Sequence, residues 1–260
     1  MKAYDIVQKA RDVERLSTSE IIHALCSEFI ELHGDRRMKD DKAILGGIGL
    51  IDDMQPITIL GLQKGRNTEE NIVRNFGSSG PAGYRKAERL MKQAEKFNRP
   101  VLTLINTAGA YAAPESEKNG IGEAIASILL TMSELTVPTL AIILGEGGSG
   151  GAIAFALTDQ VWMLENSIYS ILSPEGFASI LWKDSRLAPD AAEIMKLTAK
   201  ELKELEVIDR IIAEGNGEKE YSTDELAARL IPEIKKTFAE LSKETSKVRV
   251  EKRYERFRKF

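Results

Sequence analysis

The sequence predicts an α/β protein organised as one large domain, and three observations lead to this class. Apolar, β-branched runs typical of buried strands alternate along the chain with amphipathic stretches typical of helices. The order strand, glycine-rich turn, helix occurs twice in succession, at 101–135 and at 137–158. A chain of 260 residues, of which 43% are hydrophobic, is large enough to fill one sizeable core.

The N-terminal part of the chain has the periodicity of two helices. An amphipathic helix is expected over 4–16. The capping-box pattern STSE at 17–20 predicts a second helix from 18 to about 32. Gly34 suits the left-handed position that follows a helix end. His33 beside it could act as a base, although a neutral histidine bonded to helix-end carbonyls is favoured.

Two strands are expected next, at 43–51 and 57–63, joined by a polar turn. Residues 64–81 then form a long polar segment that becomes glycine-rich at its end. Segments of this length with little regular structure are commonly functional loops. Its cations have two open interpretations, contact with phosphate groups or a solvated face: Lys64, Arg66 and Arg74.

The rest of the chain alternates helices and strands. Helices are expected at 83–98, 115–135, 152–157, 176–182, 190–195, from 199 onward and at 223–241. Strands are expected at 101–105, 137–144, 161–164, 168–172 and 207–212. The helix at 83–98 is expected to turn Phe97 inward. The densely charged segment 243–260 is typical of a solvated helix that packs on the body of the protein or on a partner.

The stretch LGEGGSGGA, residues 144–152, lies between a predicted buried strand and a predicted buried helix. Glycines at such a junction allow a tight turn and close helix–strand packing. They also leave free N–H groups at a helix N-terminus, which favours negative charge. A site for an oxygen that becomes negative during a reaction is therefore favoured, with these backbone amides as its candidate donors: Gly147, Gly148, Gly150 and Gly151.

Two other interpretations of this stretch are weaker. A P-loop is disfavoured, because the Lys-Ser/Thr pair that follows the glycines of a P-loop is missing. The residues 147–151 satisfy the nucleophile-elbow pattern G-x-S-x-G, with Ser149 in the nucleophile position. That arrangement needs a histidine after the serine, and the only two in the chain, His23 and His33, precede it.

Composition excludes several classes of protein. The formal net charge of −4 gives no general electrostatic case for nucleic-acid binding. The single cysteine, Cys26, excludes an internal disulfide and a multi-cysteine zinc site, and it suits the reducing cytosol. The N-terminus lacks the apolar run of a signal peptide, and no apolar stretch is long enough to cross a bilayer. A cytoplasmic protein without a membrane or metal site in this chain is expected.

Several motifs, in their order and spacing, resemble those of one family, the α subunit of the carboxyltransferase component of bacterial acetyl-CoA carboxylase. Besides the glycine stretch they are ELHGDR (31–36), GLQKGR (61–66), NIVRNFG (71–77), GYRKA (83–87), AEKFNRP (94–100), SPEG (173–176) and ILWKD (180–184). The resemblance implies a ClpP/crotonase-like fold of repeated ββα units with additional N- and C-terminal helices. It implies a single carboxyltransferase domain over 1–260, with N-terminal helices at 1–34, the crotonase-like core at 35–215 and a C-terminal helical region at 216–260.

The resemblance also implies an activity. Such a subunit transfers a carboxyl group from carboxybiotin, held on the biotin carboxyl carrier protein, to acetyl-CoA, and so makes malonyl-CoA for fatty-acid biosynthesis. It is active only as an α2β2 assembly with the β subunit, which carries the zinc. Biotin carboxylase belongs to the larger complex, and ATP is used there and not in this chain. Two alternatives remain: a subunit of a related biotin-dependent acyl-CoA or malonate decarboxylase, and a scaffold that completes a partner's site.

The resemblance further implies that this chain supplies the biotin side of the site. The glycine amides would donate to the ureido oxygen of biotin, which becomes enolate-like when the carboxyl group leaves. Because the biotin base can itself take the proton from acetyl-CoA, no side-chain acid or base is required. Substrate or biotin contacts are expected from Gly109, Ala110, Tyr111, Ser149, Lys64, Arg66 and Arg74. The turn at 108–113 departs from the family pattern, since alanines stand where the family usually has Pro, Pro and Gly: Ala108, Ala112 and Ala113.

Overall fold

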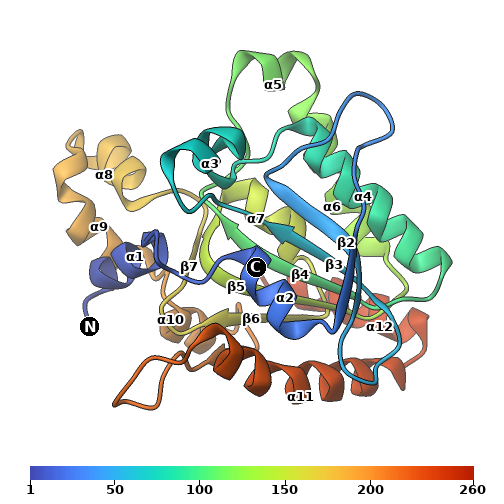
Figure 1. The fold of residues 1–260 in the computed structure, drawn as a ribbon. Helices are drawn as coiled ribbons and strands as arrows, with labels where there is room; N and C mark the ends of the chain where they lie inside the picture. Colours follow the sequence, from blue (N-terminus) through green and yellow to red (C-terminus); the bar gives the residue numbers. More distant parts are fainter.

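The computed structural model describes all 260 residues as one mixed sheet with helices on both faces (Figure 1). The strands are β1 (Glu28–Glu31), β2 (Ile44–Leu50), β3 (Ile57–Leu62), β4 (Val101–Thr107), β5 (Thr139–Gly148), β6 (Gln160–Leu164), β7 (Ile168–Ser170) and β8 (Arg210–Ile212). Their order is β1-β2-β3-β4-β5-β6-β8, with β7 paired to the far end of β5. The pairs β1–β2 and β2–β3 are antiparallel, and from β3 onward the pairs are parallel. This confirms the predicted α/β class.

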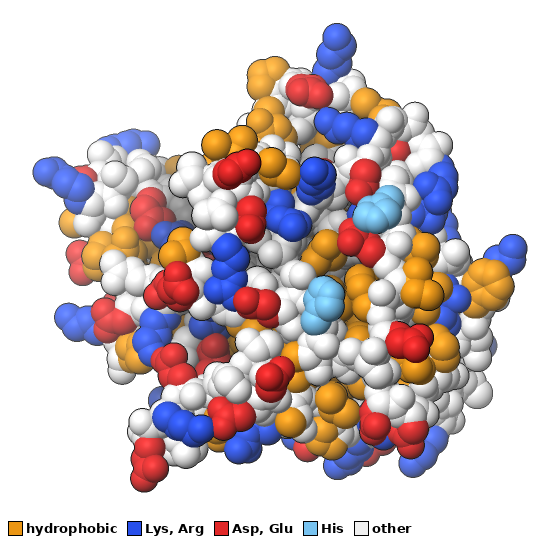
Figure 2. Space-filling view, viewed as in Figure 1, with side chains coloured by type: hydrophobic (Ala, Val, Ile, Leu, Met, Phe, Trp, Pro, Cys, Tyr) orange, Lys and Arg blue, Asp and Glu red, His pale blue; other side chains and the backbone are white.

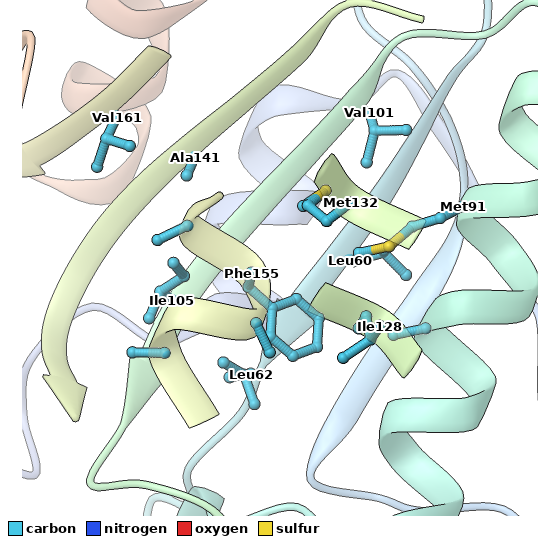
Figure 3. Close-up of a cluster of buried hydrophobic side chains, with 14 of the residues drawn as sticks. Leu60, Leu62, Met91, Val101, Ile105, Ile128, Met132, Ala141, Phe155 and Val161 are labelled. Atoms are coloured by element: carbon cyan, nitrogen blue, oxygen red, sulfur yellow. The ribbon is translucent and has the colours of Figure 1, made fainter. Parts of the chain in front are cut away.

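Each face of the sheet has its own hydrophobic core. One core lies under α4 (Pro81–Lys96), α6 (Ile121–Glu134) and α7 (Ser149–Ala156), and the other under α2 (Thr18–Leu25) and α11 (Thr223–Ser242). Figure 3 shows Phe155 of α7 pointing into the first core, among Leu60, Leu62 and Ile128. Because β3 to β6 are buried on both faces, they are near-continuously apolar, as parallel strands covered by helices are.

The remaining helices lie around the rim of this sandwich. They are α1 (Ala3–Arg11), α3 (Thr68–Val73), α5 (Pro114–Lys118), α8 (Pro174–Trp182), α9 (Ala188–Met195), α10 (Ala199–Glu204) and α12 (Ser246–Phe257), with short 3₁₀ turns at Asn75–Gly77 and Ser185–Leu187. Figure 1 shows α8 and α9 standing off from the sheet at one edge, beside α1. A small third core joins α1 to α9 through Val7, Ala10 and Ala192.

The helix predicted over 18–32 is wrong in its second half. The capping box forms, because Ser17 accepts from the Glu20 N–H and the Glu20 carboxylate accepts from the Ser17 N–H. The helix nevertheless ends at Leu25, and Glu28–Glu31 is a strand antiparallel to β2. Gly47 of β2 explains this strand. A Cβ at Gly47 would lie 2.7 Å from the ring of Phe29, so the Phe29 ring of β1 occupies the space that a side chain on β2 would fill.

Three further expectations need correction. Residues 64–81 are not a plain loop, because α3 begins there on an Asn67 cap. The helix predicted over 115–135 is two helices, broken at Gly120, whose φ is +80°. Phe97 does not turn inward: it caps α4, is 58% exposed, and its ring lies 5.1 Å from the Arg99 guanidinium carbon.

The charged C-terminal helix packs on the body of the protein. Arg253 of α12 is 1% exposed and donates to Asp159 at 2.7 and 2.9 Å. The same guanidinium donates to the carbonyls of Met132 and Leu135 at the end of α6. This segment was expected to pack either on the body of the protein or on a partner. The buried ion pair shows that it packs on the body.

Candidate active site

The predicted glycine turn contains no loop at all. Strand β5 runs through to Gly148, which is the N-cap of α7, and the helix begins at Ser149 with a left-handed φ of 54°. The strand is therefore longer, and the helix begins earlier, than the predicted bounds of 137–144 and 152–157. A Cβ at Gly148 would lie 2.1 Å from the carbonyl oxygen of Ala108. Only glycine allows the ends of β4 and β5 to approach this closely.

A second glycine brings the two turns together on the other side. A Cβ at Gly151 would lie 2.7 Å from the amide nitrogen of Ala110 and 2.8 Å from the Tyr84 hydroxyl. Gly109, between the contacting residues, has a φ of +144°. The expected convergence of the turns after the 101–107 and 139–148 strands is thus confirmed at the level of the backbone. It places Gly109 and Ala110 against α7.

The predicted amide donors differ in their surroundings. Gly147 lies within the sheet, paired with Thr107 of β4 on one side and Tyr169 of β7 on the other. The first N–H groups of α7, from Ser149 to Gly151, have no intrahelical acceptor, and no side chain caps this end. The helix N-terminus therefore offers several aligned donors in one place, as an oxyanion site requires.

A third segment, Asn75–Gly77, is attached to these turns. The Thr107 hydroxyl donates to the Gly77 carbonyl at 2.7 Å and accepts from the Gly109 N–H at 3.1 Å. A Cβ at Gly77 would lie 2.7 Å from the Cγ of Lys64. The end of β4 therefore fixes the segment that follows α3 as well as the turn that faces α7.

A cavity of about 390 Å³ opens beside these turns. Its walls come from α1, the segment after β3, α3 with its 3₁₀ turn, and the ends of β4 and β5. Its lining includes Arg11, Lys64, Arg66, Phe76, Ala108 and Glu146. Of the expected contact residues, Lys64 and Arg66 line this cavity.

Two expected contact residues lie elsewhere. Arg74 donates to the Lys42 carbonyl at 2.8 Å and lines a different cavity beyond α3. Tyr111 donates its N–H to the Ser79 carbonyl at 2.9 Å, and its side chain lines a third cavity of about 150 Å³. The structure of this chain therefore brings Lys64 and Arg66 together near the glycine turns, but not Arg74 or Tyr111.

The cations of the cavity are held by carboxylates. Glu146, 6% exposed, pairs with Lys64 and accepts from Arg11 at 2.6 Å. Burial raises the pKa of Glu146, but the two cations outweigh burial, so the net effect is a lowered pKa. Arg66 pairs with Glu20. Lys64 and Arg66 are thus both paired with carboxylates in this chain, and Figure 2 shows acidic and basic side chains intermingled on this side.

The sequence alone did not identify Arg11 and Glu146 as site residues. Arg11 also donates to both oxygens of Glu175 on α8, at 2.9 and 3.3 Å. Glu146 carried a signal, because a charged residue between an apolar strand and a glycine run demands a buried partner. Arg11 carried none: it is one of several cations on an amphipathic helix, and its contacts are 135 and 164 residues away in sequence.

Neither histidine completes a nucleophile elbow. The left-handed Ser149 has the backbone that such a serine adopts. His23, however, contacts its own helix through the Ser19 carbonyl at 2.7 Å. His33 lies 3.1 Å from the Asp40 carboxylate, so the expected contact with helix-end carbonyls is wrong. A nucleophilic Ser149 has no base here.

The structure has no group of three or more His, Cys, Asp and Glu side chains arranged to hold a metal ion. No helix in it has both the length and the apolar character needed to cross a bilayer.

Solved structures with this fold define the class. A transcarboxylase 12S structure superposes with a TM-score of 0.70 at 14% identity, over 90% of this chain and 44% of that one. The β subunit of a Pseudomonas aeruginosa geranyl-CoA carboxylase gives 0.67 at 17% identity, over 92% and 45%. A Pseudomonas malonate decarboxylase hetero-tetramer gives 0.69 at 14% identity, over 86% and 88%. The fold is the crotonase-like fold of carboxyltransferases.

Sequence comparison gives the family within that class. The family described as acetyl co-enzyme A carboxylase carboxyltransferase-like matches residues 1–260. The acetyl-coenzyme A carboxylase carboxyl transferase subunits alpha of two Streptococcus pneumoniae strains, Hungary19A-6 and ATCC 700669, are each 54% identical over 260 residues, the whole of both chains. The chain belongs to the family of acetyl-CoA carboxylase carboxyltransferase α subunits, biotin-dependent transferases that work with a β subunit. Family membership confirms the predicted enzyme class and favours it over a decarboxylase subunit.

Proposed function

We propose that this chain, as a single carboxyltransferase domain over 1–260, forms the biotin half of an active site completed by a β subunit. The convergence of the two glycine turns carries the proposal. Gly148 and Gly151 leave no room for a side chain, and beside them the N-terminus of α7 presents uncapped N–H groups. Such a cradle fits the ureido edge of biotin, a small, flat group whose oxygen gains negative charge as its carboxyl group leaves.

When bound, the carboxybiotin of the carrier protein supplies the carboxyl group that acetyl-CoA receives. The role of this chain is to hold the ureido oxygen with amides of the glycine turn, from Gly148 to Gly151, and to exclude water with the facing turn at Gly109 and Ala110. Amide donors work at any ordinary pH. No side-chain base is needed in this half, because the biotin base can itself take the proton from acetyl-CoA. The two cations beside Glu146 lower its pKa and so make that carboxylate a weaker base.

An exposed apolar surface on the α8–α9 hairpin supports a protein partner. Five large side chains there are 37–61% exposed: Ile180, Leu181, Trp182, Leu187 and Ile194. Exposed apolar side chains gathered on one hairpin are typical of a protein–protein contact. We assign this surface to the β subunit of an α2β2 assembly. The carrier protein, acetyl-CoA and biotin carboxylase are its further partners. Zinc is confined to the β subunit, ATP is used elsewhere in the complex, and the protein acts in the cytoplasm.

The decisive measurement is malonyl-CoA decarboxylation with biocytin, a soluble biotin derivative, on this chain alone and mixed with a β subunit. We expect turnover only in the mixture. Turnover by this chain alone would contradict the half-site and indicate a self-sufficient crotonase-like enzyme. Turnover in neither case, with the complex shown to assemble by sedimentation, would contradict the biotin role.

A further inference from the structure

The segment Asn75–Gly77 has a backbone that the known chemistry does not explain. Asn75, Phe76 and Gly77 have consecutive φ values of 47°, 55° and 78°, all left-handed. Glycine adopts this region freely and asparagine tolerates it, but a bulky aromatic residue there is strained. Strain of this kind persists only where the surrounding structure imposes it, and it is concentrated at ligand clamps and active sites.

The surrounding structure does impose it. The Gly77 N–H donates to the Arg74 carbonyl at 2.9 Å, and the Gly77 carbonyl accepts from the Thr107 hydroxyl at 2.7 Å. The backbone of Gly77 is packed between the Lys64 side chain and the carbonyl of Asn106, which would lie 2.7 and 3.2 Å from a Cβ at Gly77. The strained segment is therefore fastened to the same strand end that fastens the glycine turns.

The result is an aromatic ring held at the edge of the cavity and left uncovered. Phe76 is 59% exposed and is the only aromatic side chain that lines the 390 Å³ cavity. The other hydrophobic residues of the lining are small: Ala10, Val13 and Ala108. An exposed phenylalanine on a strained backbone has two unfavourable features at once, and a ligand that covers its ring would remove one of them.

We infer that Phe76 is a binding residue whose ring packs against the bicyclic ring system of the biotinyl group, while the polar edge of that ring faces Ala108 and Glu146, the residues through which the two glycine turns reach this cavity. The chemistry of the walls supports a flat, uncharged ring with one polar edge. Each cation of the cavity is paired with a carboxylate: Arg11 and Lys64 with Glu146, Arg66 with Glu20, and Arg15 with Glu214. An anionic ligand would have to compete with these carboxylates. This inference rests on the proposed biotin half-site.

The alternative occupant of the Phe76 ring is the partner subunit. Figure 2 shows hydrophobic side chains gathered over α3, and Ile72 and Val73 on that helix are 62% and 50% exposed. Neither of them lines the cavity with Phe76. Ile72 is therefore a matched control: it is equally exposed, four residues away, and outside the cavity.

The test uses the assembled α–β complex in malonyl-CoA decarboxylation with free biocytin. We expect Phe76→Ala to raise the KM for biocytin about five- to tenfold, the scale of one lost aromatic contact, with kcat within twofold. Phe76→Tyr should restore a near-normal KM. Phe76→Gly should raise KM as the alanine does while raising the Tm of the chain, because glycine relieves the left-handed strain. Ile72→Ala should change neither KM nor Tm appreciably.

The possible failures are distinguishable. If the wild-type complex assembles but shows no biocytin-dependent turnover, the proposed function and this inference fail together. If the wild type is active and the KM of Phe76→Ala stays within twofold, only the role of Phe76 is refuted. If Phe76→Ala and Ile72→Ala both weaken association with β in sedimentation, the ring belongs to the subunit interface, and the inference is wrong.

Discussion

Gly148 shows how one missing side chain can determine a site. Its Cα hydrogen points at the Ala108 carbonyl, where a Cβ would be only 2.1 Å from the oxygen. No rotamer relieves such a clash, because the backbone fixes the position of a Cβ and the Ala108 oxygen is itself a backbone atom. The ends of β4 and β5 would have to separate, and the amides of α7 would move from their positions beside Ala110.

We therefore expect Gly148→Ala to lower kcat in the assembled complex by roughly 10²–10³-fold, as the loss of an oxyanion donor does. The isolated chain should also unfold at a lower denaturant concentration. Gly122→Ala is the control, because nothing lies within 4 Å of a Cβ there and the residue is inside helix α6. That variant should be more stable by about 0.5–1 kcal/mol with unchanged activity. Normal turnover by Gly148→Ala would favour a scaffold role for the chain.

At the residue scale, Asp40 predicts how the stability of the protein depends on pH. Burial would raise its pKa, but hydrogen bonds from the Gly34 N–H and the Lys86 ammonium outweigh burial and lower the pKa to about 2. A lowered folded-state pKa gives stability that is present above the unfolded value and lost as pH falls through the folded one.

The free energy of unfolding should therefore fall by about 1–2 kcal/mol between about pH 4 and pH 2 on account of this group, the partial exposure of Asp40 reducing the effect. Asp40→Asn should be less stable than wild type at pH 7 and should lack this part of the acid dependence. Urea titrations at several pH values measure both quantities. An unchanged slope between pH 4 and pH 2 would refute the assignment.

At the scale of elements, α12 is fastened by two ion pairs, of which Arg253 with Asp159 is the more buried. Arg253 is buried against Asp159, and removing the cation leaves a buried carboxylate whose remaining partners are the Thr139 amide and hydroxyl. We expect Arg253→Ala to lower the free energy of unfolding by about 3–5 kcal/mol. Arg258→Ala, one turn later and exposed, should cost less than about 0.5 kcal/mol. Equal effects of the two variants in denaturant titrations would show that α12 is held by other contacts.

The elements also show what sequence could and could not predict. Strands β2 to β6 were predicted because their apolar residues form short local runs, and helices α4 and α11 because their apolar residues recur at helical spacing. The strand Glu28–Glu31 was missed, because the reason for it lies in Gly47 of β2, where the ring of Phe29 fits. The glycine turn was located, but the strand continues into it, since β7 pairs with Glu146 and its successors. Ion pairs across 135 residues, such as Arg11 with Glu146, have no local pattern at all.

At the scale of the whole molecule, the site lies at the carboxyl ends of the central strands of the sheet. Strands β3, β4 and β5 are parallel, so their carboxyl ends, with Lys64, Ala108 and Glu146, meet at one place although they are far apart in sequence. That arrangement was predictable from the repeated strand–turn–helix order. The contribution of α1, which closes the cavity from outside, was not, because nothing in an amphipathic helix says which edge it covers.

The Arg11 guanidinium binds both Glu146, beside the glycine turn, and Glu175, on α8. One side chain therefore connects the ligand site with the surface on which a partner would dock. If a partner that docks on α8 shifts Glu175, it alters the bond that Arg11 makes next to the turn. Thermodynamic linkage then works in both directions: whatever factor the partner adds to ligand affinity, the ligand must add to partner affinity. Filling the site would therefore change the affinity between the subunits by the same factor by which assembly changes the affinity for the ligand.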